Sequence, residues 1–158
     1  MDRAMMRPFL SAVLPEWVDY NRHLTQGAYG RLFADATDAA LIELGFGPEY
    51  RALTGGSFYT VETHIRFLRE IQEGASIEIE TQVLGVDAKR LHLWHVMRIA
   101  EVSDPAATEE SMLVHVDITA GSVTAMGESI RRIAADQVIS PVPEEAGRAI
   151  AALSRAPT

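Results

Sequence analysis

A short polar stretch near the N-terminus combines an acid, an amide and a base within five residues. Asp19, Asn21 and His23 separate the apolar residues 9–18 from a long segment of helical periodicity that starts at Gly27. A carboxylate just before a helix N-terminus is stabilised by the free N–H groups and by the helix dipole, and the same N–H groups could instead polarise a substrate carbonyl. The alternative is structural, because Asp and Asn also favour turns and helix caps.

The helix that follows must be buried over most of its circumference. Within 27–44 the polar residues Arg31, Asp35 and Asp38 form one narrow stripe, and apolar residues occupy most of the rest. A helix of this kind packs inside a fold rather than on its surface. Thr25 is its expected N-cap and Gly45 its expected end.

Residues after Gly56 change to a period of two, which predicts strands. We expect strands near 58–67, 77–83, 91–99 and 112–118, and a first strand at 9–18 in which Pro15 suits an edge or bulge. In the strand at 58–67, Tyr59 then shares a face with Val61, opposite Glu62 and His64. The connections, SDPAATEE (103–110) among them, are short and rich in turn formers. In the tail, SIRRIAADQ and EEAGRAIAALSR are expected as short helices.

This order of elements predicts an α+β protein, with a five- or six-stranded antiparallel sheet wrapped around one long helix. That arrangement is the hotdog fold. The chain is expected to be a single domain over 1–158, with a core at about 9–120 and a C-terminal extension at about 121–158. Such a sheet has an open edge, which is a liability unless it is paired, so at least a dimer is expected.

Composition excludes several functional classes. The net charge of −8 argues against nucleic acid and anionic membranes as partners. The chain has no Cys, which removes disulfides and thiolate chemistry, and no apolar run approaches the roughly 20 residues of a membrane span. A cytoplasmic protein is expected. His92 and His95 would point to opposite faces of a strand, so no metal site is predicted.

The stretch WVDYNRHLTQGAYGRLFADATDAALIELG resembles the start of the hotdog acyl-CoA thioesterases of the 4-hydroxybenzoyl-CoA thioesterase type. The resemblance implies that Asp19 is the catalytic carboxylate, as nucleophile or general base. It places the carbonyl-polarising N–H near Gln26 or Gly27. Arg22 stands where many relatives have Gly, so a strained positive φ, or a slightly different loop, is expected there.

The phrases FYTVETHIRFL, TQVLGVDAKRLHLWH and MLVHVD resemble a narrower branch, the betainyl-CoA thioesterases of carnitine breakdown. The chain has no Gly-x-Gly-x-x-Gly motif, so the free-standing form rather than the fusion with L-carnitine dehydrogenase is expected. The resemblance implies hydrolysis of betainyl-CoA without a cofactor, at the interface of a homodimer or homotetramer. Lys89 and Arg90, at a turn between strands, would meet the phosphates of CoA; a solvated hairpin tip is the alternative.

A trimethylammonium group donates no hydrogen bond and is recognised by aromatic faces and negative charge. The candidates for substrate binding are Trp17, Tyr20, Asn21, Tyr29, Tyr59, Glu62, His64 and Trp94, and His23 would orient the Asp19 loop or contact substrate. The aromatic rings could instead be core. Three other functions remain open at this point: a thioesterase for another small acyl-CoA, a hotdog hydratase, and a non-catalytic acyl-CoA-binding dimer.

Overall fold

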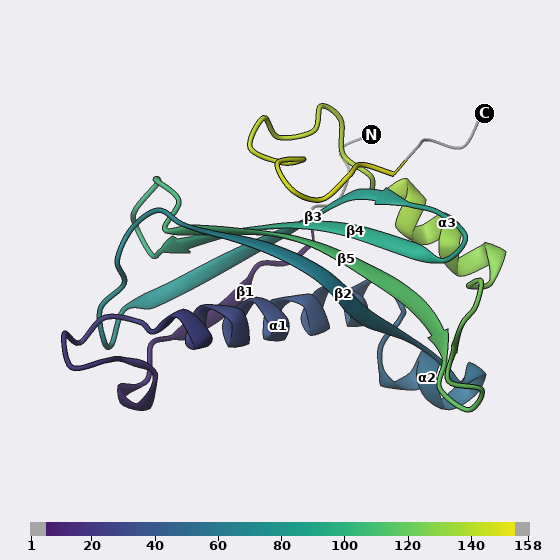
Figure 1. Ribbon diagram of the computed structural model, residues 1–158, viewed down its shortest axis with the longest axis horizontal. Helices are drawn as coiled ribbons and strands as arrows, with labels where there is room; N and C mark the ends of the chain where they lie inside the picture. The colour runs from purple at the N-terminus through teal and green to yellow at the C-terminus, as the bar shows by residue number, and fades with distance from the viewer. Residues whose placement is uncertain (1–5, 154–158) are drawn as a thin grey trace.

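The computed structural model describes residues 6–153, and they form a curled antiparallel sheet with one long helix along its inner face (Figure 1). The sheet order is β1-β3-β4-β5-β2, with β6 paired to β5. The strands are β1 (Phe9–Ala12), β2 (Gly56–Phe67), β3 (Ser76–Val86), β4 (Arg90–Ile99), β5 (Ala107–Asp117) and β6 (Ser122–Val123). The helices are α1 (Gln26–Glu43), α2 (Pro48–Thr54), α3 (Glu128–Asp136) and a 3₁₀ turn (Pro15–Trp17). The predicted hotdog architecture is confirmed.

The long helix α1 fills the concave side of the sheet, as its apolar circumference requires. Leu32 and Phe33 are fully buried, and they pack in one cluster with Ile77, Ile79 and Met97 of β3 and β4. The helix ends as expected, because Gly45 adopts a φ of 86° just after the last turn. This packing holds the N-terminus of α1 at one end of the sheet.

The N-terminal and C-terminal elements differ from the predictions. The first strand covers only Phe9–Ala12, because the chain turns into the 3₁₀ helix at Pro15, which cannot donate a strand hydrogen bond. In the tail, α3 is confirmed, but 144–153 contain turns in place of the second helix, and 154–155 lie outside the described residues. This part of the tail lies over the face of the sheet away from α1 (Figure 1), where Ile150 is 1% exposed.

Two features of β2 and β5 also depart from the sequence pattern. A bulge between Thr60 and Glu62 shifts the register of β2, so Tyr59 lies on the same face as Glu62 and not on that of Thr63. The strand β5 begins at Ala107, so Glu109 and Glu110 belong to it and not to the expected loop. Both carboxylates are buried, on opposite faces of the sheet.

Candidate active site

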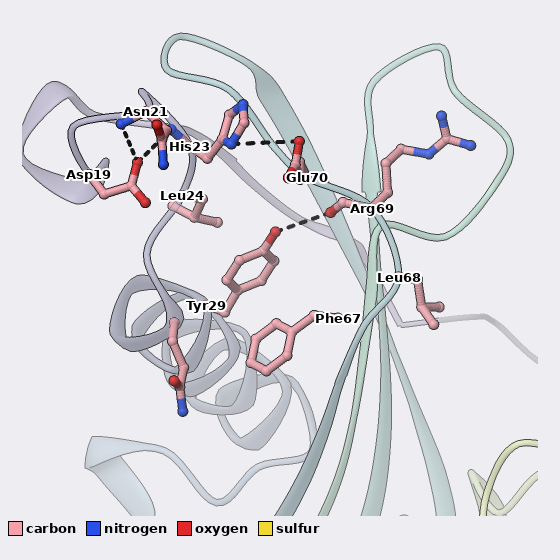
Figure 2. A pocket seen from close by; sticks show the side chains of 10 residues that line it. Asp19, Asn21, His23, Leu24, Tyr29, Phe67, Leu68, Arg69 and Glu70 are labelled. Atoms are coloured by element: carbon pink, nitrogen blue, oxygen red, sulfur yellow. Dashed lines mark hydrogen bonds and ion pairs between the residues drawn. The ribbon is translucent and has the colours of Figure 1, made fainter.

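A cavity of about 470 Å³ opens where the loop before α1 meets the end of β2 (Figure 2). It lies at the N-terminal end of the long helix. The residues that line it come from three segments: Asp19, Asn21, His23 and Leu24 from the loop, Gln26 and Tyr29 from α1, and Phe67, Leu68, Arg69 and Glu70 from the end of β2 and the turn after it. The cavity therefore brings together five of the residues predicted from sequence.

The Asp19 carboxylate is fixed by the loop that it starts. Its Oδ1 accepts the backbone N–H of Asn21 at 2.8 Å and that of His23 at 3.3 Å. The backbone N–H of Asp19 in turn donates to the carbonyl of His23 at 3.0 Å. Within residues 6–153 no hydrogen bond reaches Oδ2. One oxygen therefore orients the group, and the other is left for a water molecule or a substrate (Figure 2).

The turn that holds Asp19 needs an unusual backbone at Arg22. This residue has a φ of 62°, which confirms the strain expected where relatives have Gly. Its guanidinium lies 2.7 Å from the carboxylate of Glu73, and the N–H of Leu24 donates to the carbonyl of Ile71 at 2.7 Å. These contacts fasten the loop to the segment that connects β2 and β3.

The first turn of α1 presents hydrogen-bond donors that the protein does not use. Thr25 occupies the N-cap position, as predicted, in an extended conformation, but its side chain makes no capping hydrogen bond. The N–H groups of Ala28 and Tyr29 donate to the carbonyl of Thr25, whereas those of Gln26 and Gly27 donate to no group in the described part of the chain. A Cβ atom placed on Gly27 would have no other heavy atom of the described residues within 4 Å, so the space beside this residue is open. Such donors, with the helix dipole behind them, suit a developing oxyanion.

An aromatic pair forms the inner wall of the cavity. The rings of Tyr29 and Phe67 meet edge to face with their centroids 5.0 Å apart, and the Tyr29 hydroxyl donates to the carbonyl of Arg69 at 3.2 Å. Burial, and then the charge of Glu70, raise the pKa of Tyr29, so this hydroxyl stays protonated. The wall therefore offers aromatic faces rather than a free polar group.

The charge around the cavity is negative. Asp19 and Glu70 both line it, and His23 Nδ1 lies 3.6 Å from the carboxylate of Glu70. The guanidinium of Arg69 points away from the cavity (Figure 2) and lies 3.2 Å from Asp104. Sequence reasoning missed Phe67, Leu68, Arg69 and Glu70, because the end of a strand and the turn after it carry no spacing signal of their own.

Other predicted binding residues lie elsewhere in the protomer. Tyr20 is 94% exposed outside the cavity, and Trp17 packs against the core beneath the loop. Three residues of the group, Tyr59, Glu62 and His64, share the face of β2 that points away from α1. Trp94 is buried on the same outer face of the sheet. A single protomer does not bring these side chains to Asp19.

The predicted CoA contacts lie at the far end of the sheet. The carbonyl of Lys89 accepts the N–H of His115, which is eight residues along β5 from Ala107, the partner of Phe67. Eight strand residues span roughly 26 Å. The guanidinium of Arg90 is engaged by Asp87 at 2.6 Å, whereas the exposed ammonium of Lys89 has no ion-pair partner among residues 6–153. Within one protomer, neither side chain reaches the cavity.

The histidines of β4 confirm the predicted alternation. His92 Nε2 lies 2.7 Å from Glu110 on the outer face, and His95 is hydrogen-bonded to Thr37 and Thr81 on the inner face.

No group of three or more His, Asp or Glu side chains in the described chain is placed to hold a metal ion. None of the helices between residues 6 and 153 is long and apolar enough to cross a membrane.

Solved structures share this fold over almost the whole chain. A Staphylococcus aureus protein solved in complex with CoA superposes with a TM-score of 0.81 at 24% identity, covering 95% of this chain and 99% of that one. A structure described as a putative thioesterase from Pseudomonas putida gives a TM-score of 0.74 at 29% identity, covering 98% of this chain and 99% of that one. The similarity to the Staphylococcus aureus protein supports the fold alone. The Pseudomonas putida protein shares the fold and is itself described as a putative thioesterase.

Curated relatives are more similar in sequence. The betainyl-CoA thioesterase of Pseudomonas aeruginosa is 39% identical over 150 residues, which cover 92% of this chain and 94% of that protein. The L-carnitine dehydrogenase/betainyl-CoA thioesterase of Agrobacterium fabrum is 46% identical over 141 residues, which cover 87% of this chain but 28% of that longer protein. The family model for the thioesterase-like superfamily matches residues 13–150. Because that match includes the Asp19 loop, α1 and every strand from β2 to β6, the chain belongs to the thioesterase-like superfamily.

Proposed function

We propose that this chain hydrolyses an acyl-CoA thioester, and that its substrate is betainyl-CoA, which yields glycine betaine and CoA. The observation that supports this most is the pairing of two unused groups in one cavity. Oδ2 of Asp19 has no hydrogen bond from the described residues, and the N–H groups of Gln26, which also lines the cavity, and of the next residue, Gly27, are equally unengaged. A carboxylate beside two oxyanion donors is sufficient for thioester hydrolysis, because a thiolate leaves without help from a strong acid.

Two routes fit these groups. In the first, Asp19 removes a proton from water, the water oxygen adds to the carbonyl carbon, and the C–S bond breaks as the thiolate takes up a proton. In the second, the Asp19 carboxylate attacks the carbonyl carbon and the thiolate leaves; water then adds to the aspartyl carbonyl carbon of the resulting anhydride, and the acyl product departs with the bridging Asp19 oxygen. In both, the N–H groups of Gln26 and Gly27 hold the oxyanion. A single turnover in ¹⁸O-labelled water separates them, because the second route first delivers an unlabelled oxygen from Asp19 to the product.

The cavity favours a cationic acyl group over a neutral one. It offers the faces of Tyr29 and Phe67 and the carboxylates of Asp19 and Glu70, while the nearby guanidinium of Arg69 points away. A quaternary ammonium binds to aromatic faces and negative charge, with roughly 0.5–2 kcal/mol from each ring. The relatives named as betainyl-CoA thioesterases support the same substrate.

A homodimer would bring the CoA contacts to the site. β2 is an unpaired edge of 12 residues with Tyr59, Val61 and Phe67 each at least half exposed. Antiparallel pairing of two such edges places the Phe67 end of one strand beside the Gly56 end of the other, which is the end near Lys89. Lys89 of a second copy would then lie near the cavity, where a phosphate of CoA could meet it. Sedimentation as a monomer at micromolar concentration would contradict this arrangement.

A thiol-release assay over a panel of acyl-CoAs tests the function directly. Betainyl-CoA should be hydrolysed with the highest kcat/KM, and Asp19→Asn should abolish most of the turnover. Glu16→Gln is a matched control, since Glu16 is an exposed acid of the preceding 3₁₀ turn that does not line the cavity. Binding of acyl-CoA without release of CoA would point to the non-catalytic alternative.

A further inference from the structure

The helix-facing side of β5 carries two successive polar side chains that are buried without hydrogen-bond partners. Glu109 is 5% exposed, and its one ion-pair contact with the described residues is His95 Nε2, 4.0 Å from Oε1. Ser111 is 1% exposed, and its Oγ has no partner within residues 6–153. Buried polar groups in folded proteins are nearly always hydrogen-bonded. Ser111 Oγ is such an exception, and Glu109 lies next to it on the same face with no hydrogen-bond partner among the described residues.

His95 does not neutralise the Glu109 carboxylate. Both imidazole nitrogens are already engaged, Nδ1 with Thr81 Oγ1 at 2.9 Å and Nε2 with Thr37 Oγ1 at 3.1 Å. Burial lowers the pKa of His95 to about 3 and raises the pKa of Glu109 to about 7. Above neutral pH, therefore, Glu109 carries a charge in a poorly solvated position that no cation of the described residues offsets.

The strand register places Glu109 on the inner face of the sheet, on the strand next to the one that carries Phe67. Phe67 pairs with Ala107 and Ile65 pairs with Glu109, so Glu109 lies two residues further along the same face of the sheet. From the helix side, Phe33 is one turn beyond Tyr29, and its ring centroid lies 5.9 Å from that of His95. Glu109 and His95 thus form the layer that backs the rings of Tyr29 and Phe67.

We propose that Glu109 is the specificity residue for a permanently cationic acyl group, which its carboxylate attracts through the Tyr29–Phe67 wall. The inference rests on the proposed thioesterase function. A quaternary ammonium has no N–H, so only charge and aromatic faces can distinguish it from a tert-alkyl group of the same shape. Asp19 and Glu70 are exposed and their charges are weakened by water and salt, whereas a charge in the interior acts over a longer distance.

The test compares betainyl-CoA with its neutral isostere, 3,3-dimethylbutyryl-CoA, by kcat/KM at pH 8. The wild-type chain should prefer the cation at least tenfold, which is about 1.4 kcal/mol. Glu109→Gln should reduce this preference to less than threefold, by slowing the cationic substrate only. Glu110→Gln is the matched control, because Glu110 is the adjacent buried acid on the opposite face, and it should keep the wild-type preference.

A second variant tests the charge without removing the acid. Ile65→Lys places an ammonium group opposite Glu109 on the neighbouring strand, and should also abolish the preference. If thermal unfolding shows that Glu109→Gln does not fold, the substrate preference of Ile65→Lys tests the role of the Glu109 charge in its place. Retention of the tenfold preference in the folded variant, or an equal loss for both substrates, overturns the role of Glu109 and leaves the thioesterase intact. Failure of the wild-type chain to hydrolyse either substrate overturns the proposed function itself.

Discussion

Each face of the sheet buries a glutamate of β5, but only the glutamate on the outer face is hydrogen-bonded to other described residues. Glu110 points to the outer face, where His92 Nε2 lies 2.7 Å from it and the N–H of Gly147 donates to both its oxygens. Glu109, one residue earlier, points to the inner face and has no hydrogen-bond partner in the described chain. The outer carboxylate fastens the C-terminal segment to the sheet. Partnered acids here stabilise the fold, whereas unpartnered ones lie on the side where substrate chemistry is proposed.

Removal of the outer partner should have the largest effect on stability. In His92→Ala, Glu110 loses its side-chain partner while it remains buried, and breaking such a pair costs about 3 kcal/mol or more. We expect the free energy of unfolding in urea to fall by that amount, with turnover per folded molecule within threefold of wild type. A loss of turnover as large as that of an Asp19 variant would contradict the purely structural role of the outer face, because it would show that His92 and Glu110 also affect the reaction.

Asp19→Asn should have the largest effect on the reaction. The amide keeps the shape of the carboxylate but cannot serve as base or nucleophile, so kcat should fall on the order of 10²-fold or more. KM and the midpoint of thermal unfolding should change little, because Asp19 is exposed at the cavity mouth. Near-normal turnover of the pure variant would remove Asp19 from the mechanism.

The raised pKa of Glu109 predicts a distinctive dependence of stability on pH. Because its pKa of about 7 in the folded protein exceeds the ordinary value of 4.5, the folded state binds more protons between these values. The wild-type free energy of unfolding, relative to that of Glu109→Gln, should therefore fall as pH rises from 4.5 to about 7, by up to about 1.4 kcal/mol per unit. Thermal unfolding of both proteins across this range measures the difference. A flat difference would mean that the inner carboxylate has a partner after all.

His95 should oppose Glu109 over part of that range. Its pKa of about 3 in the folded protein lies below the ordinary 6.5, so its contribution to stability is lost as pH falls from 6.5 towards 3. In the wild-type chain the two contributions nearly cancel between pH 4.5 and 6.5. Glu109→Gln should then uncover a rise of stability with pH in this window.

Lys89→Ala should have the smallest effect. If Lys89 of a second copy meets a phosphate of CoA, its loss removes an interaction made equally in the ground and transition states, so KM should rise several-fold at unchanged kcat. The change should shrink at high salt. Arg90→Ala is the informative companion, because Asp87 already engages that guanidinium and a weaker effect is expected. An unchanged KM for Lys89→Ala at low salt would place the phosphate contact elsewhere.

Much of the inner face could be predicted from the sequence, because its signals are local. The helical period, the Asp19 loop and the strand alternation each depend on neighbouring residues. The structure confirms the helix and the alternation of His92 and His95 in β4, and it places the Asp19 loop directly before the helix. The start of β5 could not be predicted in this way, because two adjacent acids, Glu109 and Glu110, are typical of a loop. The groups that satisfy the buried Glu110 carboxylate come from distant parts of the sequence, His92 and Gly147. The bulge at Thr60–Glu62 likewise leaves no mark in the composition, and it reverses the face on which Tyr59 lies.

The cavity and the tail depend on tertiary contacts. Phe67 and Glu70 line the cavity only because the turn after β2 packs beside the Asp19 loop. The segment EEAGRAIAALSR has the composition of a helix, yet its described part forms turns in which the N–H of Gly147 is directed to Glu110. In both places long-range packing overrides local propensity.

The left-handed backbone of Arg22 and the ion pair of its side chain with Glu73 affect stability in opposite directions. A glycine there would adopt the φ of 62° without strain and would gain about 1 kcal/mol of stability. It would also remove the guanidinium that holds the loop to Glu73. Laboratory selection for thermal tolerance should therefore enrich Arg22→Gly only if the relief of backbone strain exceeds the loss of that ion pair.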